Sequence, residues 1–239
     1  MDREFASRTE LLLGSEKVKK LMNSNVLVVG LGGVGAYAAE LICRAGIGKM
    51  TIVDGDIYQP SNINRQLGAL SSTLGKNKAD NMKERLLEIS PGLKLTVIPK
   101  YVTDEEMPGL LNEKFDYVVD AIDTLSPKIQ LIYNTLQKGF PLVSSMGSGA
   151  KLDPSGIKVA DISKTHNCNL ARAIRKNLHR LGIYEGFKVV YSPEEVIKES
   201  VMLVKGERNK KSVVGTISYM PAIFGCYCAS VVIRDIIET

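Results

Sequence analysis

The sequence has few residues of the kinds that hold metals or form disulfide bridges. It contains four cysteines and two histidines in 239 residues, and no two cysteines form a C-x-x-C pair. Cysteines at such irregular spacing exclude a disulfide framework and favour the reduced thiols of a cytoplasmic protein. His166 and Cys168 lie two positions apart, but without a second pair of ligands they do not make a zinc site.

Long apolar runs and targeting segments are also lacking. No stretch reaches the roughly 20 consecutive apolar residues that a helix needs to cross a bilayer. The first residues, MDREFASRTE, carry charges and have no apolar core of a signal peptide. We therefore expect a cytoplasmic protein with no membrane contact. Apolar residues make up 44% of the chain, which suits a globular core, and a formal net charge of +5 would attract acidic partners.

A glycine-rich turn is the most informative stretch of the chain. Apolar periodicity around it predicts a strand, a helix and a strand over residues 26–29, 36–45 and 50–53. The turn reads GLGGVG, with glycines at Gly30, Gly32, Gly33 and Gly35. In the spacing G-x-G-x-x-G the first glycine allows a tight turn, the second lets backbone approach a phosphate, and the last lets helix and strand pack closely. The plainer interpretation is a tight turn in an ordinary α/β domain, but the complete strand–helix–strand unit predicts a nucleotide site at the helix N-terminus.

Polar side chains beyond the second strand distinguish between candidate nucleotides. Asp54 ends that strand and can accept hydrogen bonds from ribose hydroxyls. Asp56 follows it, then the segment SNINRQ over 61–66, and further on Lys78 and Asp123. Arginine and lysine can neutralise a triphosphate, and a carboxylate can bind Mg²⁺. This set suits ATP with Mg²⁺ better than NAD.

The rest of the chain alternates predicted helices and strands. Apolar patterns indicate further helices over 8–22, 72–89, 104–111, 126–137 and 222–233. They indicate further strands over 93–98, 116–122, 141–144 and 157–162, and a strand and turn over 188–196. Residues 205–212 read as a charged, exposed loop. The predicted fold class is α/β, a Rossmann-like, mostly parallel sheet flanked by helices, with a C-terminal extension of antiparallel strands and a basic helix.

The basic helix lies within residues 163–182. Apolar residues recur on one face of it, at Leu170, Ile174, Leu178 and Leu181, and Gly182 ends it. The other positions are basic, at Arg172, Arg175, Lys176, His179 and Arg180. A helix of this kind is often only a solvated face. Because no acidic residue occurs from 166 to 184, however, we interpret the basic face as a contact surface for nucleic acid.

Five motifs occur in the order GxGGVG, D-x-D, N-x-N-R-Q, G-x-x-K-A and D-A-x-D. In this order they resemble the ubiquitin-activating, ThiF-type adenylating superfamily, over nearly the whole chain. The resemblance implies that Arg65, Lys78 and Asp123 are catalytic, that Asp123 is also the magnesium-associated residue, and that Arg8 reaches into the ATP site of a partner subunit in a homodimer. The residues expected to bind the cofactor are Gly30, Gly32, Gly33, Gly35, Asp54, Asp56, Asn62, Asn64, Gln66 and Arg8.

Four further segments are similar to the tRNA threonylcarbamoyladenosine dehydratase branch of that superfamily. They read SRTELLLG, THNCNLARAIRKNLHRLGI, VVYSPEE and GTISYMPAIFGCYCAS. The resemblance implies that ATP adenylates the carboxylate of the threonylcarbamoyl side chain on the adenosine beside the tRNA anticodon, and that AMP leaves as this side chain cyclises. It implies tRNA as a partner, bound by Arg172, Arg175, Lys176 and Arg180, and leaves a sulfur-transfer partner protein open. We expect one ThiF-like adenylating domain over 1–239, with a nucleotide-binding half at 1–150 and a half for substrate and tRNA at 151–239.

Two alternatives stay open. The first is an adenylating activator of a small ubiquitin-like sulfur-carrier protein, although such activators often carry two C-x-x-C pairs for zinc, which this chain lacks. The second is a non-catalytic nucleotide module or an NAD oxidoreductase, against which Arg65, Lys78 and Asp123 argue. Some members of the dehydratase branch have a cysteine just before the stretch matching Gly215. Val214 stands there in this chain, so we predict cyclisation without a thiol intermediate.

Overall fold

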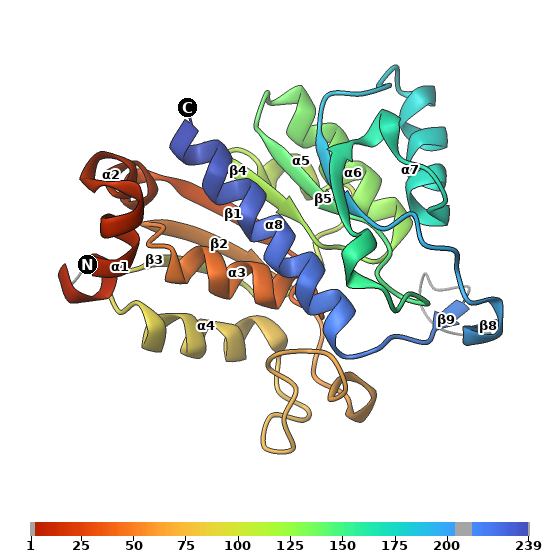
Figure 1. Ribbon diagram of the computed structural model, residues 1–239, viewed down its shortest axis with the longest axis horizontal. Helices are drawn as coiled ribbons and strands as arrows, with labels where there is room; N and C mark the ends of the chain where they lie inside the picture. Colours follow the sequence, from red (N-terminus) through yellow and green to blue (C-terminus); the bar gives the residue numbers. More distant parts are fainter. Residues whose placement is uncertain (1–2, 204–211, 239) are drawn as a thin grey trace.

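The computed structural model describes residues 3–203 and 212–238. It contains a seven-stranded sheet with the strand order β3-β2-β1-β4-β5-β7-β6 (Figure 1). All neighbouring pairs are parallel except β6 and β7, which are antiparallel. The strands are β1 (Asn25–Val29), β2 (Lys49–Val53), β3 (Lys94–Ile98), β4 (Tyr117–Asp120), β5 (Leu142–Ser145), β6 (Lys158–Asp161) and β7 (Lys188–Tyr191). A short antiparallel hairpin, β8 (Val201–Leu203) with β9 (Ser212–Val214), stands apart from this sheet. The predicted α/β class and mostly parallel sheet are confirmed.

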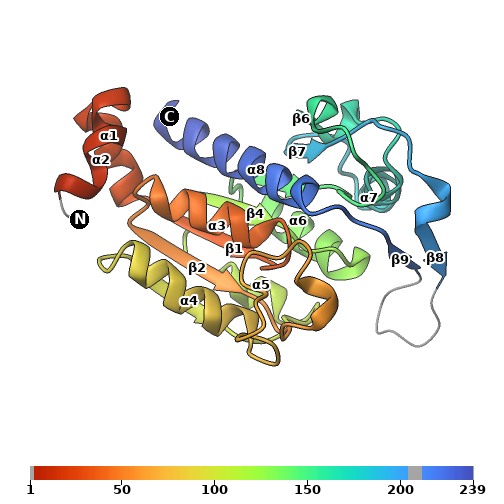
Figure 2. The same cartoon turned by 60° about the horizontal axis from the view of Figure 1, so that its bottom comes forward.

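Helices cover both faces of the sheet (Figures 1 and 2). They are α1 (Arg3–Leu13), α2 (Ser15–Asn23), α3 (Gly35–Arg44), α4 (Lys78–Ile89), α5 (Met107–Leu110), α6 (Leu125–Gln137), α7 (Asn169–Arg180) and α8 (Tyr219–Glu238). Alternate residues of β1 point to opposite faces, so that Val26 and Val28 pack with α3, α4 and α8, whereas Leu27 and Val29 pack with α5, α6 and α7. Burial on both faces explains why the central strands read as continuous apolar runs rather than alternating ones.

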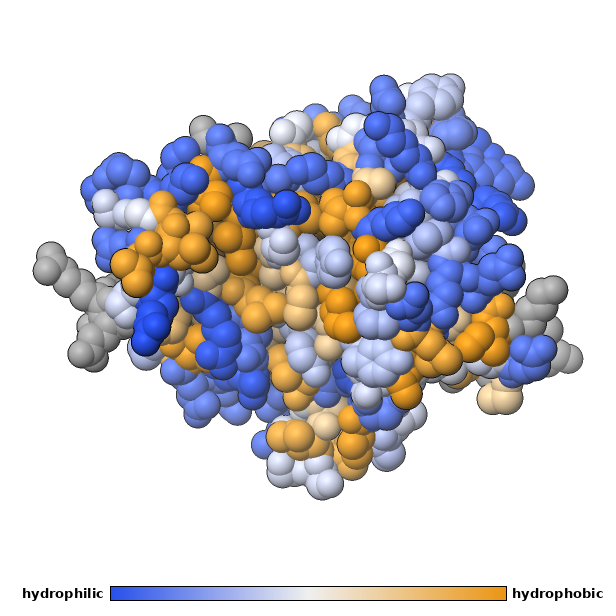
Figure 3. Space-filling view, viewed as in Figure 1, coloured by the Kyte–Doolittle hydropathy of each residue, from blue (hydrophilic) through white to orange (hydrophobic). Residues whose placement is uncertain are grey.

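The last helix, α8, is long and apolar enough by length and composition alone to cross a membrane. Half of its most apolar window is nevertheless buried inside the protein, which is the pattern of a core helix. A Cβ added at Gly225 would lie 2.5 Å from the carbonyl oxygen of Val34, so α8 packs closely against the start of α3. Figure 3 shows apolar side chains gathered on the face of the molecule that α3 and α8 form, and along its edge at α1 and α2.

Several predicted helix boundaries are wrong for local reasons. The helix expected over 8–22 is interrupted at Gly14, which has a φ of +82° and separates α1 from α2. The helix expected over 72–89 begins only at Lys78, because the side chain of Asn77 accepts hydrogen bonds from the N–H groups of the first turn. Residues 72–75 form turns instead, and Asn77 pairs in an isolated β-bridge with Ile57. The charged loop expected over 205–212 lies outside the described residues, apart from Ser212 at the start of β9.

A buried ion pair joins α6 to the end of β4. Lys128 Nζ lies 2.8 Å from Asp120 Oδ2, and neither side chain has any exposed surface. Ser144 Oγ donates to the same carboxylate oxygen at 2.6 Å, and Lys128 Nζ also donates to the carbonyl oxygen of Ile122 at 3.0 Å. Removing two charges from water is costly, so each charge depends on these bonds. The pair therefore fixes the turn at 120–123, where β4 reaches the carboxyl edge of the sheet.

Lys128→Met should lower the free energy of unfolding by about 3–5 kcal/mol, because it leaves the Asp120 carboxylate buried and unpaired. The double change Lys128→Met with Asp120→Asn removes both charges and should recover most of that loss. Urea unfolding followed by circular dichroism measures both values.

The matched control is Lys49→Met, which breaks a 3.4 Å ion pair with Glu113 in which both side chains are about half exposed. It should cost less than about 1 kcal/mol. A loss at Lys128 no larger than at Lys49 would show that the buried pair does not stabilise the turn.

Candidate functional site

The glycine turn follows β1 at the carboxyl edge of the sheet, and two of its glycines are fixed by packing. Gly30 has a φ of +90°, and a Cβ there would lie 2.7 Å from the carbonyl oxygen of Ala121. A Cβ at Gly35 would lie 1.8 Å from the carbonyl oxygen of Gly30. Neither position has room for a side chain, so both glycines serve the close contact between turn, helix and neighbouring strand.

The other two glycines of the turn differ in their surroundings. A Cβ at Gly33 would lie 2.9 Å from Cβ of Pro221 in the first turn of α8. Among the described residues, Gly32 faces open space, with only Nε2 of Gln66 within 4 Å of an added Cβ, at 3.7 Å. Gly32 is therefore the glycine of this turn whose backbone a bound group can approach closely.

Gln66 lies beside this open space and is itself almost completely buried. Its exposed fraction is 9%, and within residues 3–203 and 212–238 its Oε1 accepts no hydrogen bond. A buried acceptor without a donor costs about 1–3 kcal/mol. A ligand that brings a donor to the glycine turn would satisfy this oxygen, so the arrangement fits a polar ligand at this point.

Asp54 at the end of β2 braces the glycine turn from the other side. Its Oδ2 accepts a hydrogen bond from the N–H of Leu31 at 2.6 Å, and its Oδ1 accepts from the N–H of Asp56 at 2.8 Å. Burial raises the pKa of Asp54, while the nearby charge of Lys78 and these two N–H groups oppose the shift. Each oxygen keeps a second lone pair with which it can accept from a ligand hydroxyl.

Lys78, the first residue of α4, has a buried side chain, although a lysine on an amphipathic helix is usually solvated. Its side chain is only 6% exposed, and Nζ lies 2.9 Å from Asp56 Oδ2. The hydroxyl of Tyr101 donates to the other oxygen of Asp56. Tyr101 follows β3, and sequence reasoning missed it. The only available signal was its place just after a parallel strand, at the edge where ligands lie in such sheets.

The segment 61–66 curls over the same edge. Asn62 ends a short 3-10 helix, Pro60–Asn62, and its Oδ1 accepts from the N–H of Gln59 at 3.0 Å. Arg65 is half-buried, and its Nη1 donates to the carbonyl oxygen of Ser61 at 2.9 Å and to Oδ1 of Asn64 at 2.9 Å. The guanidinium of Arg65 is thus held by backbone and amide oxygens rather than by an acid, which leaves its charge available to an anion.

Asp123 completes the edge and is exposed. The two residues before it are held in place. Lys128 donates a hydrogen bond to the carbonyl oxygen of Ile122, and Ala121 lies against Gly30. Within the part of the chain that the structure describes, no three histidine, cysteine, aspartate or glutamate side chains form a group that could hold a metal. Mg²⁺ is often held by one or two carboxylates together with ligand phosphates, so Asp123 fits such a site only in combination with a bound nucleotide.

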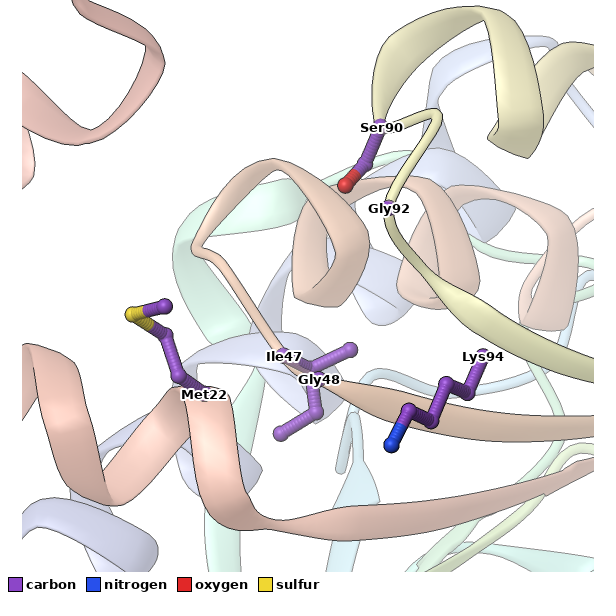
Figure 4. A pocket seen from close by; sticks show the side chains of 6 residues that line it. All are labelled: Met22, Ile47, Gly48, Ser90, Gly92 and Lys94. Atoms are coloured by element: carbon purple, nitrogen blue, oxygen red, sulfur yellow. The ribbon is translucent and has the colours of Figure 1, made fainter. Parts of the chain in front are cut away.

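The structure does not bring Arg8 to this site. Arg8 lies in α1, and α1 and α2 precede the amino end of β1, whereas the glycine turn follows its carboxyl end (Figure 1). A cavity of about 120 Å³ also lies at the amino ends of the strands, lined in part by Met22, Gly48 and Lys94 (Figure 4). Because β1 and β2 are parallel, this cavity is at the opposite edge from the glycine turn and is not part of the site.

The basic helix α7 presents three of its four predicted contact residues to solvent. Arg172, Lys176 and Arg180 are exposed. Arg175 is half-buried and donates to the hydroxyl of Thr165, so it holds the preceding loop in place. On the predicted apolar face, Ile174 and Leu178 are buried, and Ala171 is buried beside them. Leu181 is 46% exposed, because α7 ends one residue before it.

The loop after β5 connects the glycine turn to α7. Asn64 Nδ2 donates to the carbonyl oxygen of Thr216 at 2.9 Å. Next to Thr216, the carbonyl oxygen of Gly215 accepts from the N–H of Ala150 at 2.8 Å. A Cβ at Gly147 would lie 4.0 Å from Cβ of Leu170 in the first turn of α7. A chain of contacts therefore links the segment 61–66 at the carboxyl edge of the sheet, through residues 214–217 and 147–150, to the basic helix.

None of the free cysteines of α3 and α8 presents an activated thiol. Burial raises the pKa of Cys43 to about 11 and that of Cys228 to about 12. Cys226 is exposed, yet partial burial of its sulfur raises its pKa as well. The thiolate is the reactive form, so these shifts disfavour nucleophilic chemistry at the three positions.

Comparison with known proteins identifies the group to which this arrangement belongs. The tRNA threonylcarbamoyladenosine dehydratase of Bacillus subtilis (strain 168) is 38% identical over 239 residues, which cover 97% of this chain and 94% of that protein. The crystal structure of E. coli tRNA N6-threonylcarbamoyladenosine dehydratase, TcdA, in complex with ATP matches with a TM-score of 0.90 at 31% identity, over 99% of this chain and 95% of that chain. A structure of the same E. coli protein with AMP gives the same values. The ThiF family itself matches residues 6–239, and the chain therefore belongs to the ThiF family.

Proposed function

We propose that the chain is an ATP-dependent tRNA threonylcarbamoyladenosine dehydratase, which adenylates the carboxylate of the modified adenosine and drives its cyclisation. The observation that carries this proposal is the carboxyl edge of the sheet, where the segments that carry Arg65, Lys78 and Asp123 lie near a glycine turn with one open glycine. Such a charged edge suits a triphosphate better than a nicotinamide dinucleotide. Full-length similarity to the B. subtilis dehydratase and to TcdA with ATP supports the same substrate pair.

The reaction overcomes the poor reactivity of a carboxylate. A carboxylate oxygen of the threonylcarbamoyl group attacks the α-phosphorus of ATP, the bond to pyrophosphate breaks, and an acyl-adenylate forms. An atom of the same side chain then attacks the acyl carbon, and AMP leaves with the former carboxylate oxygen. Since AMP is a far better leaving group than hydroxide, the ring closes. The protein holds the two reactants in line and neutralises phosphate charge.

The residues of the edge divide this work. Asp54 is placed to accept from the ribose hydroxyls. Lys78 acts on Asp54 beside the glycine turn, and the backbone of Arg65 lies 3.5 Å from an added Cβ at Gly33, so both cations are assigned to the phosphates. Asp123, exposed at the same edge, would hold Mg²⁺ together with phosphate oxygens. Bound Mg²⁺ would supply neutralisation of the phosphate charge, as it does in other phosphoryl-transfer sites.

The polyanionic substrate fits the second half of the chain. Exposed Arg172, Lys176 and Arg180 on α7 provide positive charge on the helix to which the chain of contacts from Asn64 leads. We assign residues 1–150 to the nucleotide and 151–239 to the tRNA. The two parts share one sheet, because β7 of the second part pairs with β5 of the first, and β6 pairs in turn with β7. A tRNA substrate also favours a cytoplasmic enzyme.

Arg8 and two leucines argue for a homodimer. Leu11 and Leu12 are 84% and 82% exposed, and they lie three and four residues after Arg8 on α1, which places all three on one helix face. A second copy that covers this face would remove both leucines from water. Because Arg8 lies at the opposite edge of its own sheet, it can serve an ATP site only in the partner subunit.

The two glycines Gly32 and Gly35 provide a test of the nucleotide site. Gly32→Ala adds a methyl group to open space, so it should leave the unfolding temperature unchanged but weaken ATP binding by at least about tenfold, as measured by calorimetry. Gly35→Ala is the matched comparison, since its methyl group would meet a backbone oxygen at 1.8 Å and should destabilise the fold itself. Unchanged ATP affinity in Gly32→Ala would place the nucleotide elsewhere.

The reaction is tested by mass analysis of anticodon-loop nucleosides after incubation of tRNA with ATP. The wild-type chain should convert threonylcarbamoyladenosine to a product lighter by one water, with AMP and pyrophosphate released. Asp123→Asn should lower turnover by at least about a hundredfold without unfolding, since the residue is exposed. ATP–pyrophosphate exchange that requires a small carrier protein instead of modified tRNA would favour the sulfur-carrier alternative.

The dimer is tested by subunit mixing. Arg8→Ala and Asp123→Asn should each be inactive alone, but a mixture that exchanges subunits should recover part of the activity, because mixed dimers contain one site with both residues intact. Leu11→Glu with Leu12→Glu should give a monomer by light scattering. Absence of recovery in a mixture shown to contain mixed dimers would contradict a site shared between subunits.

A further inference from the structure

We propose that the turn at the end of α7 binds an unpaired nucleobase of the RNA substrate by stacking. The platform consists of His179, in the last turn of α7, and Tyr184, four residues after the helix ends. The proposal rests on the proposed function, because it names the part of the tRNA that the basic helix contacts. It assigns a specific role to two aromatic rings that the adenylation chemistry does not use.

The two rings form one exposed surface. Their centroids are 4.9 Å apart with an angle of 37° between the planes, so the rings lie partly over each other. Tyr184 is 62% exposed, which is unusual for a large aromatic side chain, and His179 is exposed as well. A ring supported on one side and open on the other is the arrangement on which an unstacked base can lie.

The backbone holds Tyr184 rigidly in this exposed position. The N–H of Gly182 donates to the carbonyl oxygen of His179 at 3.2 Å, and the N–H of Ile183 donates to that of Leu178 at 3.0 Å. These are the two bonds of a Schellman motif, and Gly182 has the positive φ, +78°, that the motif requires. Two residues beyond Tyr184, the N–H of Gly186 donates to Oδ2 of Asp161 at 2.8 Å. Tyr184 therefore lies between two anchored points, and a base that stacks on it need not order a flexible loop.

Charge around the platform favours RNA over a protein partner. Arg180 follows His179 directly, and Lys176 lies one helical turn before Arg180, both exposed. No acidic residue occurs from 166 to 184, and the first one after the platform is Glu185. Cations can hold the phosphates of a strand while the rings hold its base, which is how proteins bind single-stranded nucleic acid.

The position of the platform separates it from the reacting nucleotide. Leu170, in the first turn of α7, lies near Gly147 of the loop after β5, which contacts Asn64 through residues 150, 215 and 216. Arg180 is ten residues further along the helix, which corresponds to about 15 Å. The base on the platform is therefore a different nucleotide from the adenosine that is adenylated.

Tyr184→Trp gives a direct reporter, because the chain contains no other tryptophan. The probe is an anticodon stem-loop RNA that carries threonylcarbamoyladenosine, and the comparison is a fully paired RNA duplex with the same number of nucleotides. The stem-loop should quench the tryptophan fluorescence by stacking, and the paired duplex should not.

Affinity measurements separate stacking from charge. Tyr184→Ala should weaken binding of the stem-loop by about fivefold to a hundredfold with an unchanged dependence on salt. Tyr184→Phe keeps the ring and should bind as the wild type does. Combined Arg172→Ala, Lys176→Ala and Arg180→Ala should weaken binding and also make it less dependent on salt.

Several results would overturn the platform. They are unchanged affinity in Tyr184→Ala, an unquenched tryptophan in Tyr184→Trp, and equal quenching by the paired duplex. A change of oligomeric state in Tyr184→Ala would identify the turn as a protein contact and would also overturn it. Binding does not require turnover, so a wild-type chain that binds RNA through Tyr184 but forms no dehydrated nucleoside would refute the proposed reaction and leave the platform standing.

Discussion

The contact between two backbone turns is the constraint on which the site depends. Gly30 lies against the carbonyl oxygen of Ala121, and Gly35 lies against the carbonyl oxygen of Gly30, at distances that admit no side chain. This contact brings the end of β1 to the end of β4 and sets the start of α3 above them. The N–H groups at the start of α3 and Asp123 consequently lie at the same edge of the sheet, which is where the proposed function places the phosphates.

Charges are arranged around this contact in two different ways. Beneath it, Lys128 and Asp120 neutralise each other completely out of water and keep the turn at 120–123 in place. Around it, Lys78 and Arg65 are bound only by partly exposed groups or by neutral oxygens, so their charges can still act on a ligand. The first arrangement provides rigidity, and the second provides attraction for phosphate.

The sequence predicts the features that local patterns determine. Apolar runs predicted the central strands, and the glycine spacing predicted the turn, because burial on both faces and steric exclusion act on neighbouring residues. Tertiary contacts could not be predicted in the same way. The burial of Lys78 depends on where Asn77 caps α4, the bond of Arg175 to Thr165 depends on a preceding loop, and Tyr101 reaches Asp56 only because β3 lies beside β2. The place of Arg8 likewise follows from the break at Gly14.

The contact of Gly33 with Pro221 has a consequence for the synthesis of the protein. Pro221 belongs to α8, which lies at the C-terminal end of the chain, yet it packs on the glycine turn that follows the first strand. A nascent chain emerges from the ribosome in order, so its strands and most of its helices are available before α8. Docking of α8 is therefore a late step in the folding of this edge of the sheet, because Pro221 can close against the glycine turn only after the earlier elements have been made.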